Sequence, residues 1–111
     1  MEDSILKSVR KNIGLGEDNT DFDSDLIDHI NSVFDILYQV GIGPRKRFYI
    51  EDDSTTWDEY LPNGGPYSVK SYIYLKVRMM FDPPSNSSLY AEIDKRIDEF
   101  EWRLSIDSSV E

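Results

Sequence analysis

Residues 69–81 read VKSYIYLKVRMMF, and this stretch determines the architecture that we expect. At 100° per residue, its apolar side chains would cover almost the whole surface of a helix rather than a single stripe. They fall on three neighbouring faces: Val69, Ile73, Val77 and Met80, then Tyr72, Leu75 and Met79, then Tyr74 and Phe81. A helix that is apolar almost all round belongs in a core, a bilayer or a subunit interface. We therefore predict a central helix with the other elements packed around it.

The chain after this helix predicts a sharp turn and a second helix folded back on the first. Asp82 is followed by Pro83 and Pro84, which lack the amide donor and disfavour helical geometry in the residue before them. Residues 85–88 offer hydroxyl and amide side chains that can cap a new helix over residues 89–104. That helix has one apolar stripe, formed by Leu89, Ile93, Ile97, Phe100 and Leu104.

Two further helices are expected nearer the N-terminus. Ser4 can cap a short helix over residues 5–13, which Gly14 ends. A longer helix over residues 22–40 has an acidic outer side and is ended by Gly41. Its apolar side is formed by Phe22, Leu26, Ile30, Val33, Leu37 and Val40.

Residues 42–66 lack a helical pattern and predict a long central loop or a short β-hairpin, with one helical turn over residues 57–61. Residues 105–111 predict a frayed, flexible tail. A chain of 111 residues is long enough for one core but not two, so we expect a single domain over residues 1–111. The predicted fold is all-α, an antiparallel four-helix arrangement of the bundle type.

Composition limits the functional classes. The 22 acidic and 12 basic residues give a net charge of −10, which repels nucleic-acid phosphates and argues against specific DNA reading. Passage of DNA along a channel of like charge remains compatible with this sign. The chain has no cysteine, no apolar stretch long enough to span a membrane and no signal-peptide pattern, so we expect a cytosolic product without a membrane partner.

No motif predicts catalysis, a cofactor or a metal. Asp21, Asp23 and Asp25 imitate the start of an EF-hand loop, but Leu26 and Ser32 occupy the positions where that loop needs glycine and glutamate. These carboxylates are better explained by the start of a helix, whose dipole favours negative charge. His29, the only histidine, has no neighbouring nucleophile or second metal ligand and fits a helix boundary. We expect a protein that is not an enzyme.

Basic and aromatic side chains are the candidate contact residues. Lys76 lies near the Val69 face, so pairing with a carboxylate of the second or fourth helix is favoured, whereas Lys70 and Arg78 point elsewhere and could meet acids of a neighbouring subunit. Trp102 lies about 140° or more from every residue of its helix's stripe, which predicts either an interface anchor or packing beneath the loop or tail. Arg45, Lys46 and Arg47 could contact phosphate or another protein, or pair with the acids of residues 51–53.

The stretch SYIYLKVRMMFDPP at residues 71–84, followed by FEWRL at residues 100–104, resembles the C-terminal half of head–tail connector proteins of tailed bacteriophages. The TTW of residues 55–57 and the acidic helix before it also fit, so the resemblance covers roughly residues 22–104. It adds Trp57 to the candidate interface residues.

This resemblance implies a structural virion protein at the head–tail neck, assembled in the cytoplasm of the bacterial host. Such adaptors bind the portal after DNA packaging, form a ring that extends the DNA channel and provide a docking surface for the next neck or tail-completion component. The implied partners are therefore further copies of the chain, the portal, that component and passing DNA. Two alternatives stay open: another neck or tail-completion protein, and a small acidic prophage protein that binds a host partner.

Overall fold

The computed structural model describes residues 4–16, 18–61 and 67–110, with side chains described as far as Leu104. The described chain forms five helices: α1 (Ile5–Asn12), α2 (Asp23–Gln39), α3 (Trp57–Tyr60), α4 (Tyr67–Phe81) and α5 (Ser87–Val110). Among the described residues there is no β-strand, and the only β contact is an isolated bridge between Ser4 and Thr56. The all-α prediction is confirmed, and the described part of residues 42–66 forms no hairpin.

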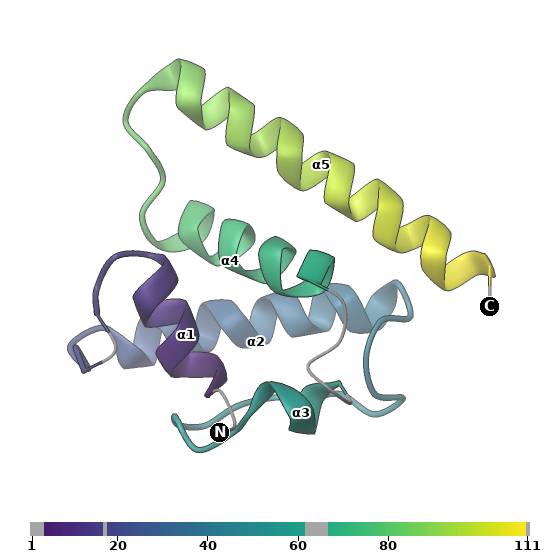
Figure 1. Cartoon of the computed structure of the whole chain (residues 1–111), viewed down its shortest axis with the longest axis horizontal. Helices are drawn as coiled ribbons and strands as arrows, with labels where there is room; N and C mark the ends of the chain where they lie inside the picture. The colour runs from purple at the N-terminus through teal and green to yellow at the C-terminus, as the bar shows by residue number, and fades with distance from the viewer. Residues whose placement is uncertain (1–3, 17, 62–66, 111) are drawn as a thin grey trace.

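Helix α4 occupies the middle of the molecule, between α2 on one side and α5 on the other, and runs antiparallel to both (Figure 1). Val69, Tyr72, Ile73 and Val77 are buried, and the apolar residues on its other faces pack partly against the same core. This arrangement is the one predicted from a helix with several apolar faces. Met80 departs from it, because its side chain is 37% exposed near the end of the helix.

Helix α5 folds back over α4 after the turn at Asp82 and the two prolines (Figure 1). The backbone amide of Leu89 donates to the Asn86 side chain at 3.0 Å, which caps the start of the helix. Ile93, Ile97 and Leu104 are buried against the core, whereas Leu89 is 39% exposed. The helix continues to Val110, beyond the end predicted at residue 104, so the backbone of residues 105–110 is helical.

The N-terminal helices cover the other side of α4. In α1, the Ser4 hydroxyl accepts a hydrogen bond from the Lys7 amide at 3.2 Å, as the predicted cap requires. Most of the predicted stripe of α2 is buried, although Phe22, just before the helix, is 40% exposed. The buried residues of the two helices are Ile5, Leu6, Val9, Leu26, Ile30, Val33, Phe34 and Leu37.

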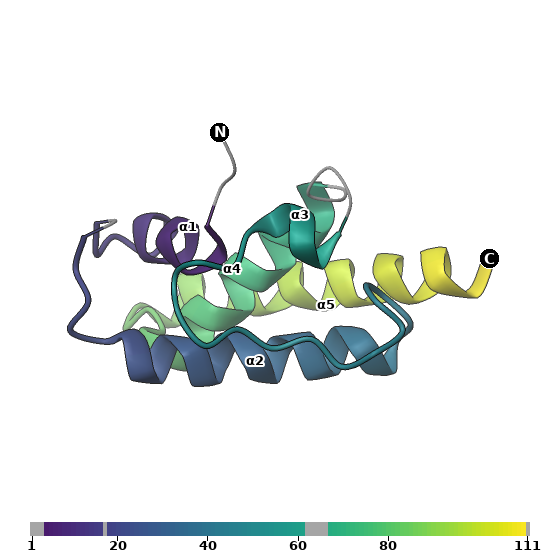
Figure 2. The same ribbon diagram turned by 90° about the horizontal axis from the view of Figure 1, so that it is seen from below.

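After α2 the chain reverses and runs back along this helix before it reaches α3 (Figure 2). The Asn31 side chain holds this returning segment, because it accepts from the Ile50 amide at 2.8 Å and donates to the Ile50 carbonyl at 3.0 Å. These two bonds replace the pairing that a strand would have supplied. The predicted helical turn is present as α3, where the Glu59 carboxylate accepts from the Thr56 amide at 3.1 Å.

Candidate interface surfaces

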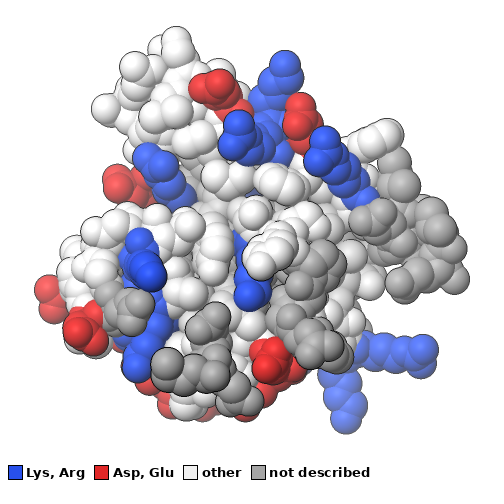
Figure 3. Space-filling model, viewed as in Figure 1, with Lys and Arg blue, Asp and Glu red and all other residues white. Residues whose placement is uncertain are grey.

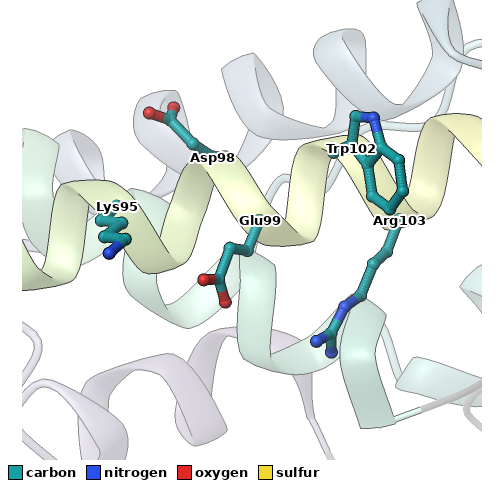
Figure 4. Close-up of a pocket in the computed structure, with 5 residues that line it drawn as sticks. All are labelled: Lys95, Asp98, Glu99, Trp102 and Arg103. Atoms are coloured by element: carbon teal, nitrogen blue, oxygen red, sulfur yellow. The ribbon is translucent and has the colours of Figure 1, made fainter.

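The outer side of α5 carries the most exposed tryptophan side chain of the molecule. Trp102 is 68% exposed and lies in a shallow depression with Lys95, Asp98, Glu99 and Arg103 (Figure 4). All five residues belong to α5, so no other element of the described chain forms an opposite wall. The structure therefore agrees with the predicted outward direction of Trp102 and not with packing beneath the loop. An indole with charged neighbours on an open helix face is suited to protein contact.

A polar link between α4 and α5 fixes the direction of this face. Tyr72, fully buried in α4, donates its phenol hydrogen to Glu101 at 2.8 Å, and the Lys76 ammonium lies 3.5 Å from the same carboxylate oxygen. Burial, and then the bond to Glu101, raise the pKa of the Tyr72 phenol well above its ordinary value. The prediction that Lys76 pairs within the molecule, with α2 or α5, is confirmed for α5. Glu101 directly precedes Trp102, so the link holds the turn of α5 that carries the indole.

Trp57 was a candidate interface residue, and the structure shows that this assignment is wrong. Its side chain is only 2% exposed, its ring nitrogen donates to the Ser8 hydroxyl at 2.9 Å, and its ring meets Tyr74 edge-on. The Lys70 ammonium lies 5.3 Å from the centre of the indole, in cation–π contact. Trp57 is therefore a core residue that joins α1, α3 and α4, and Lys70 has a partner within the chain.

Arg78, in the last turn of α4, remains a candidate contact. It is half-buried, and no ion pair with another described residue is formed. Its position leaves the guanidinium available to a carboxylate of another molecule.

The basic triplet after α2 divides into two parts. Arg47 pairs with Asp35 of α2 at 2.7 Å and lies over the Tyr38 ring at 4.9 Å, while the Tyr49 hydroxyl donates to the same carboxylate at 2.9 Å. The predicted alternative pairing with the acids of residues 51–53 is therefore wrong for Arg47. Arg45 and Lys46 are exposed and form no ion pair with a described residue. They are the part of the triplet that is available to a partner.

The opposite end of α2 is organised around Arg10, which sequence reasoning missed. This side chain is 1% exposed, donates to Asp23 through Nε at 2.9 Å, and lies 3.9 Å from Asp53. A buried guanidinium needs such partners because an unpaired buried charge is costly. The signal in the sequence was a cation one turn after Leu6, on the apolar side of α1. Its partners lie 13 and 43 residues away, so no local sequence pattern could predict them.

The carboxylates that imitate a calcium loop have other roles. Asp23 is engaged by Arg10, and Asp21 and Asp25 are exposed. Within the described part of the chain, no group of three or more histidine, aspartate or glutamate side chains could hold a metal ion. His29 is half-buried with its ring 6.5 Å from that of Phe81, which agrees with a helix-boundary residue.

None of the described helices has both the length and the apolar content needed to cross a membrane. The candidate contact surfaces of the described residues are the α5 face around Trp102, Arg78 of α4, and the exposed bases Arg45 and Lys46 after α2.

Comparison with known proteins supplies a family. Neither the curated proteins nor the solved structures contain a significant match. The family described as "Phage connector protein" matches residues 5–111, which include all five helices and every candidate contact residue. Because the match extends over nearly the whole sequence, the chain belongs to the phage connector protein family.

Proposed function

We propose that this phage connector binds the portal vertex of the filled head, assembles there as a ring that extends the DNA channel, and presents the docking surface for the next neck or tail component. Membership of the connector family and the sequence resemblance support this role. The observation that carries it is the α5 face around Trp102. An aromatic side chain 68% exposed, in an open depression that one helix lines, is suited to serve as an anchor for contact with a second protein.

The net negative charge of the chain supports the same role. Ring subunits use one surface to bind the preceding copy and a different surface to bind the next, and the portal would provide the template that closes the series. The inner wall of such a ring should not bind the phosphates of the DNA that passes through it. The net charge of −10 suits passage rather than retention, because like charges repel within about a Debye length, ~8 Å at physiological salt.

Electron microscopy of phage lysates with this gene disrupted tests the proposal. We expect filled or DNA-leaking heads lying beside free, complete tails, because heads without the connector cannot present the docking surface. Supplying the intact gene in trans should restore joined particles. If disruption leaves normal joined particles, the chain acts elsewhere and this function is wrong.

A further inference from the structure

The basic residues Arg45 and Lys46 form a fixed projection beyond the C-terminal end of α2. They directly precede Arg47, which is tied to α2 through Asp35 and the Tyr38 ring. Gly43, with φ of 92°, packs against the Tyr60 ring and fixes the chain on the other side. We call residues 45–46 the basic tip. Both side chains are exposed, and no described carboxylate lies within 4.0 Å of either.

The N-terminal half of α2 presents the opposite charge. Asp25 and Asp28 lie on one side of the helix, Asp21 lies in the turn just before it, and all three side chains are exposed. We call these three residues the acidic face. No ion pair with a described residue neutralises them, whereas Asp35, further along the same side, is neutralised by Arg47. Acids without an ion partner among the described residues therefore lie at the start of α2, and the bases Arg45 and Lys46 lie in the segment that follows its end.

The two surfaces cannot satisfy each other within one molecule. Helix α2 has 17 residues, which is about 25 Å at 1.5 Å per residue. In Figure 3, acidic side chains lie at the left edge, where α2 begins, and basic side chains project at the lower right, where the chain turns back after α2. Opposite charges at opposite ends of a rigid rod are complementary only between molecules.

We infer that the occupant of the acidic face is a second copy of this chain, whose basic tip lies against it. The contact joins two different surfaces, so it repeats head to tail, as a ring requires. Charge complementarity is the argument: copies with a net charge of −10 repel one another, and this repulsion is offset where exposed bases of one copy meet exposed acids of the next. The inference rests on the proposed ring and assigns it an interface.

Cysteine crosslinking in isolated filled heads provides the first test, because the chain has no cysteine of its own. The double variant Asp28→Cys/Lys46→Cys is supplied to phage that lack the gene, and the heads are treated with a mild oxidant. We expect a ladder of disulfide-linked multimers that collapses on reduction, and monomers only from either single variant. Monomers from the double variant, with the protein present in the heads, would overturn the contact. Absence of the protein from heads would instead overturn the proposed function, and the ring contact with it.

Charge reversal gives an independent test. Arg45→Glu/Lys46→Glu and Asp25→Lys/Asp28→Lys should each lower the yield of joined particles at least about tenfold, since like charges then face each other. The four substitutions together should restore most of the yield. The controls are Lys7→Glu/Arg96→Glu and Glu92→Lys/Asp94→Lys, which make the same changes in net charge at exposed positions elsewhere and should leave the yield unchanged.

The variant with all four substitutions distinguishes a second copy of the chain from other molecules that could bind the basic tip. If reversal of the tip lowers the yield and reversal of the acids fails to restore it, the tip binds DNA phosphate or another virion protein, and the self-contact is wrong. Circular dichroism of each variant confirms the helical fold. The cysteine crosslinking test and its single-cysteine controls involve no charge reversal. They therefore still test the contact if a charge-reversal variant misfolds.

Discussion

At the scale of single residues, the two tryptophans show how one side-chain type serves opposite purposes. Trp57 is 2% exposed and fills the core, whereas Trp102 is 68% exposed on the outer side of α5. The difference arises from their surroundings, since the Trp57 ring nitrogen donates to the Ser8 hydroxyl and its ring packs edge-on with Tyr74. Trp102 has charged neighbours of its own helix.

Substitution of each tryptophan by alanine should therefore separate assembly from stability. Trp102→Ala should change the free energy of unfolding by about 0.5 kcal/mol or less and impair particle joining. Trp57→Ala should cost about 3–5 kcal/mol because it leaves a large cavity. Urea denaturation followed by circular dichroism, with particle counts from the same variants, checks both. Equal destabilisation by the two substitutions would contradict the assignment.

The direction of Trp102 away from the apolar stripe was predicted correctly and the exposure of Trp57 was not, and both outcomes have one physical reason. A helix with a clear stripe fixes the direction of every residue on it, so the position of Trp102 followed from Ile93 and Ile97. Trp57 lies at the start of a four-residue helix after an irregular segment, where no period indicates which side is buried. Lys76 was placed by the same helical argument and found its partner on α5.

At the scale of elements, the segment between α2 and α3 is held by short contacts. Gly43 has φ of 92°, and a Cβ atom added there would lie 2.9 Å from the Tyr60 ring. Gly14, which follows α1, has nearly the same φ of 91° with no atom within 4 Å of such a Cβ. The two positions share the backbone conformation and differ in the space available.

Alanine at these two glycines should measure that difference. Gly14→Ala should cost about 1–2 kcal/mol, the strain of a left-handed conformation with a side chain. Gly43→Ala should cost about 1–3 kcal/mol more, because the Tyr60 ring must also move. Chemical denaturation of both variants gives the comparison. If the two substitutions cost the same, the segment adapts freely and is not packed against α3.

The link between α4 and α5 should appear in the pH dependence of stability. Because the folded state raises the pKa of Tyr72, it keeps the phenol proton at a pH where the unfolded chain loses it. The free energy of unfolding should therefore be unaffected by this group below about pH 10 and fall as pH rises further. Urea denaturation at a series of pH values from about 9 to about 11, on either side of the ordinary tyrosine pKa, measures how the free energy of unfolding changes with pH.

Phenylalanine variants identify the group responsible. Tyr72→Phe should make the alkaline decline shallower and leave the part due to Tyr60, whose pKa is also raised by burial, whereas Tyr67→Phe, at a side chain 87% exposed on the same helix, should leave the decline unchanged. A decline of equal slope in Tyr72→Phe would assign the effect to other groups. The sequence alone could not predict this dependence, since nothing in the spacing of Tyr72 and Glu101 shows that they meet.

At the scale of the whole molecule, the excess of acid opposes the compact state. A net charge of −10 on 111 residues produces repulsion that sodium chloride screens, while the buried pair of Arg10 and Asp23 is screened much less. The melting temperature should therefore rise by a few degrees between low and physiological salt. Scanning calorimetry measures it, and a fall would mean that exposed ion pairs such as Arg47–Asp35 outweigh the repulsion.

The architecture was more predictable than the charged contacts. Apolar periodicity, together with proline and glycine residues that end helices, predicted four helices, two of their caps and the central place of α4. These signals act over only a few residues. The pairs formed by Arg10 and Arg47 required the fold itself, because each joins elements that are distant in sequence. The candidate surfaces themselves are local in sequence, because a single helix lines the α5 face around Trp102 and the basic tip consists of two consecutive residues.

The two hydrogen bonds between Asn31 and Ile50 have an evolutionary consequence. They attach the returning segment to α2 downstream of Arg45 and Lys46, so a change of side chain at those two positions reaches neither the core nor α3. Under the contact that we infer, substitutions at these two positions would change the affinity for a neighbouring copy and leave the folded scaffold intact. Selection could then act on the contact and on the stability of the fold separately.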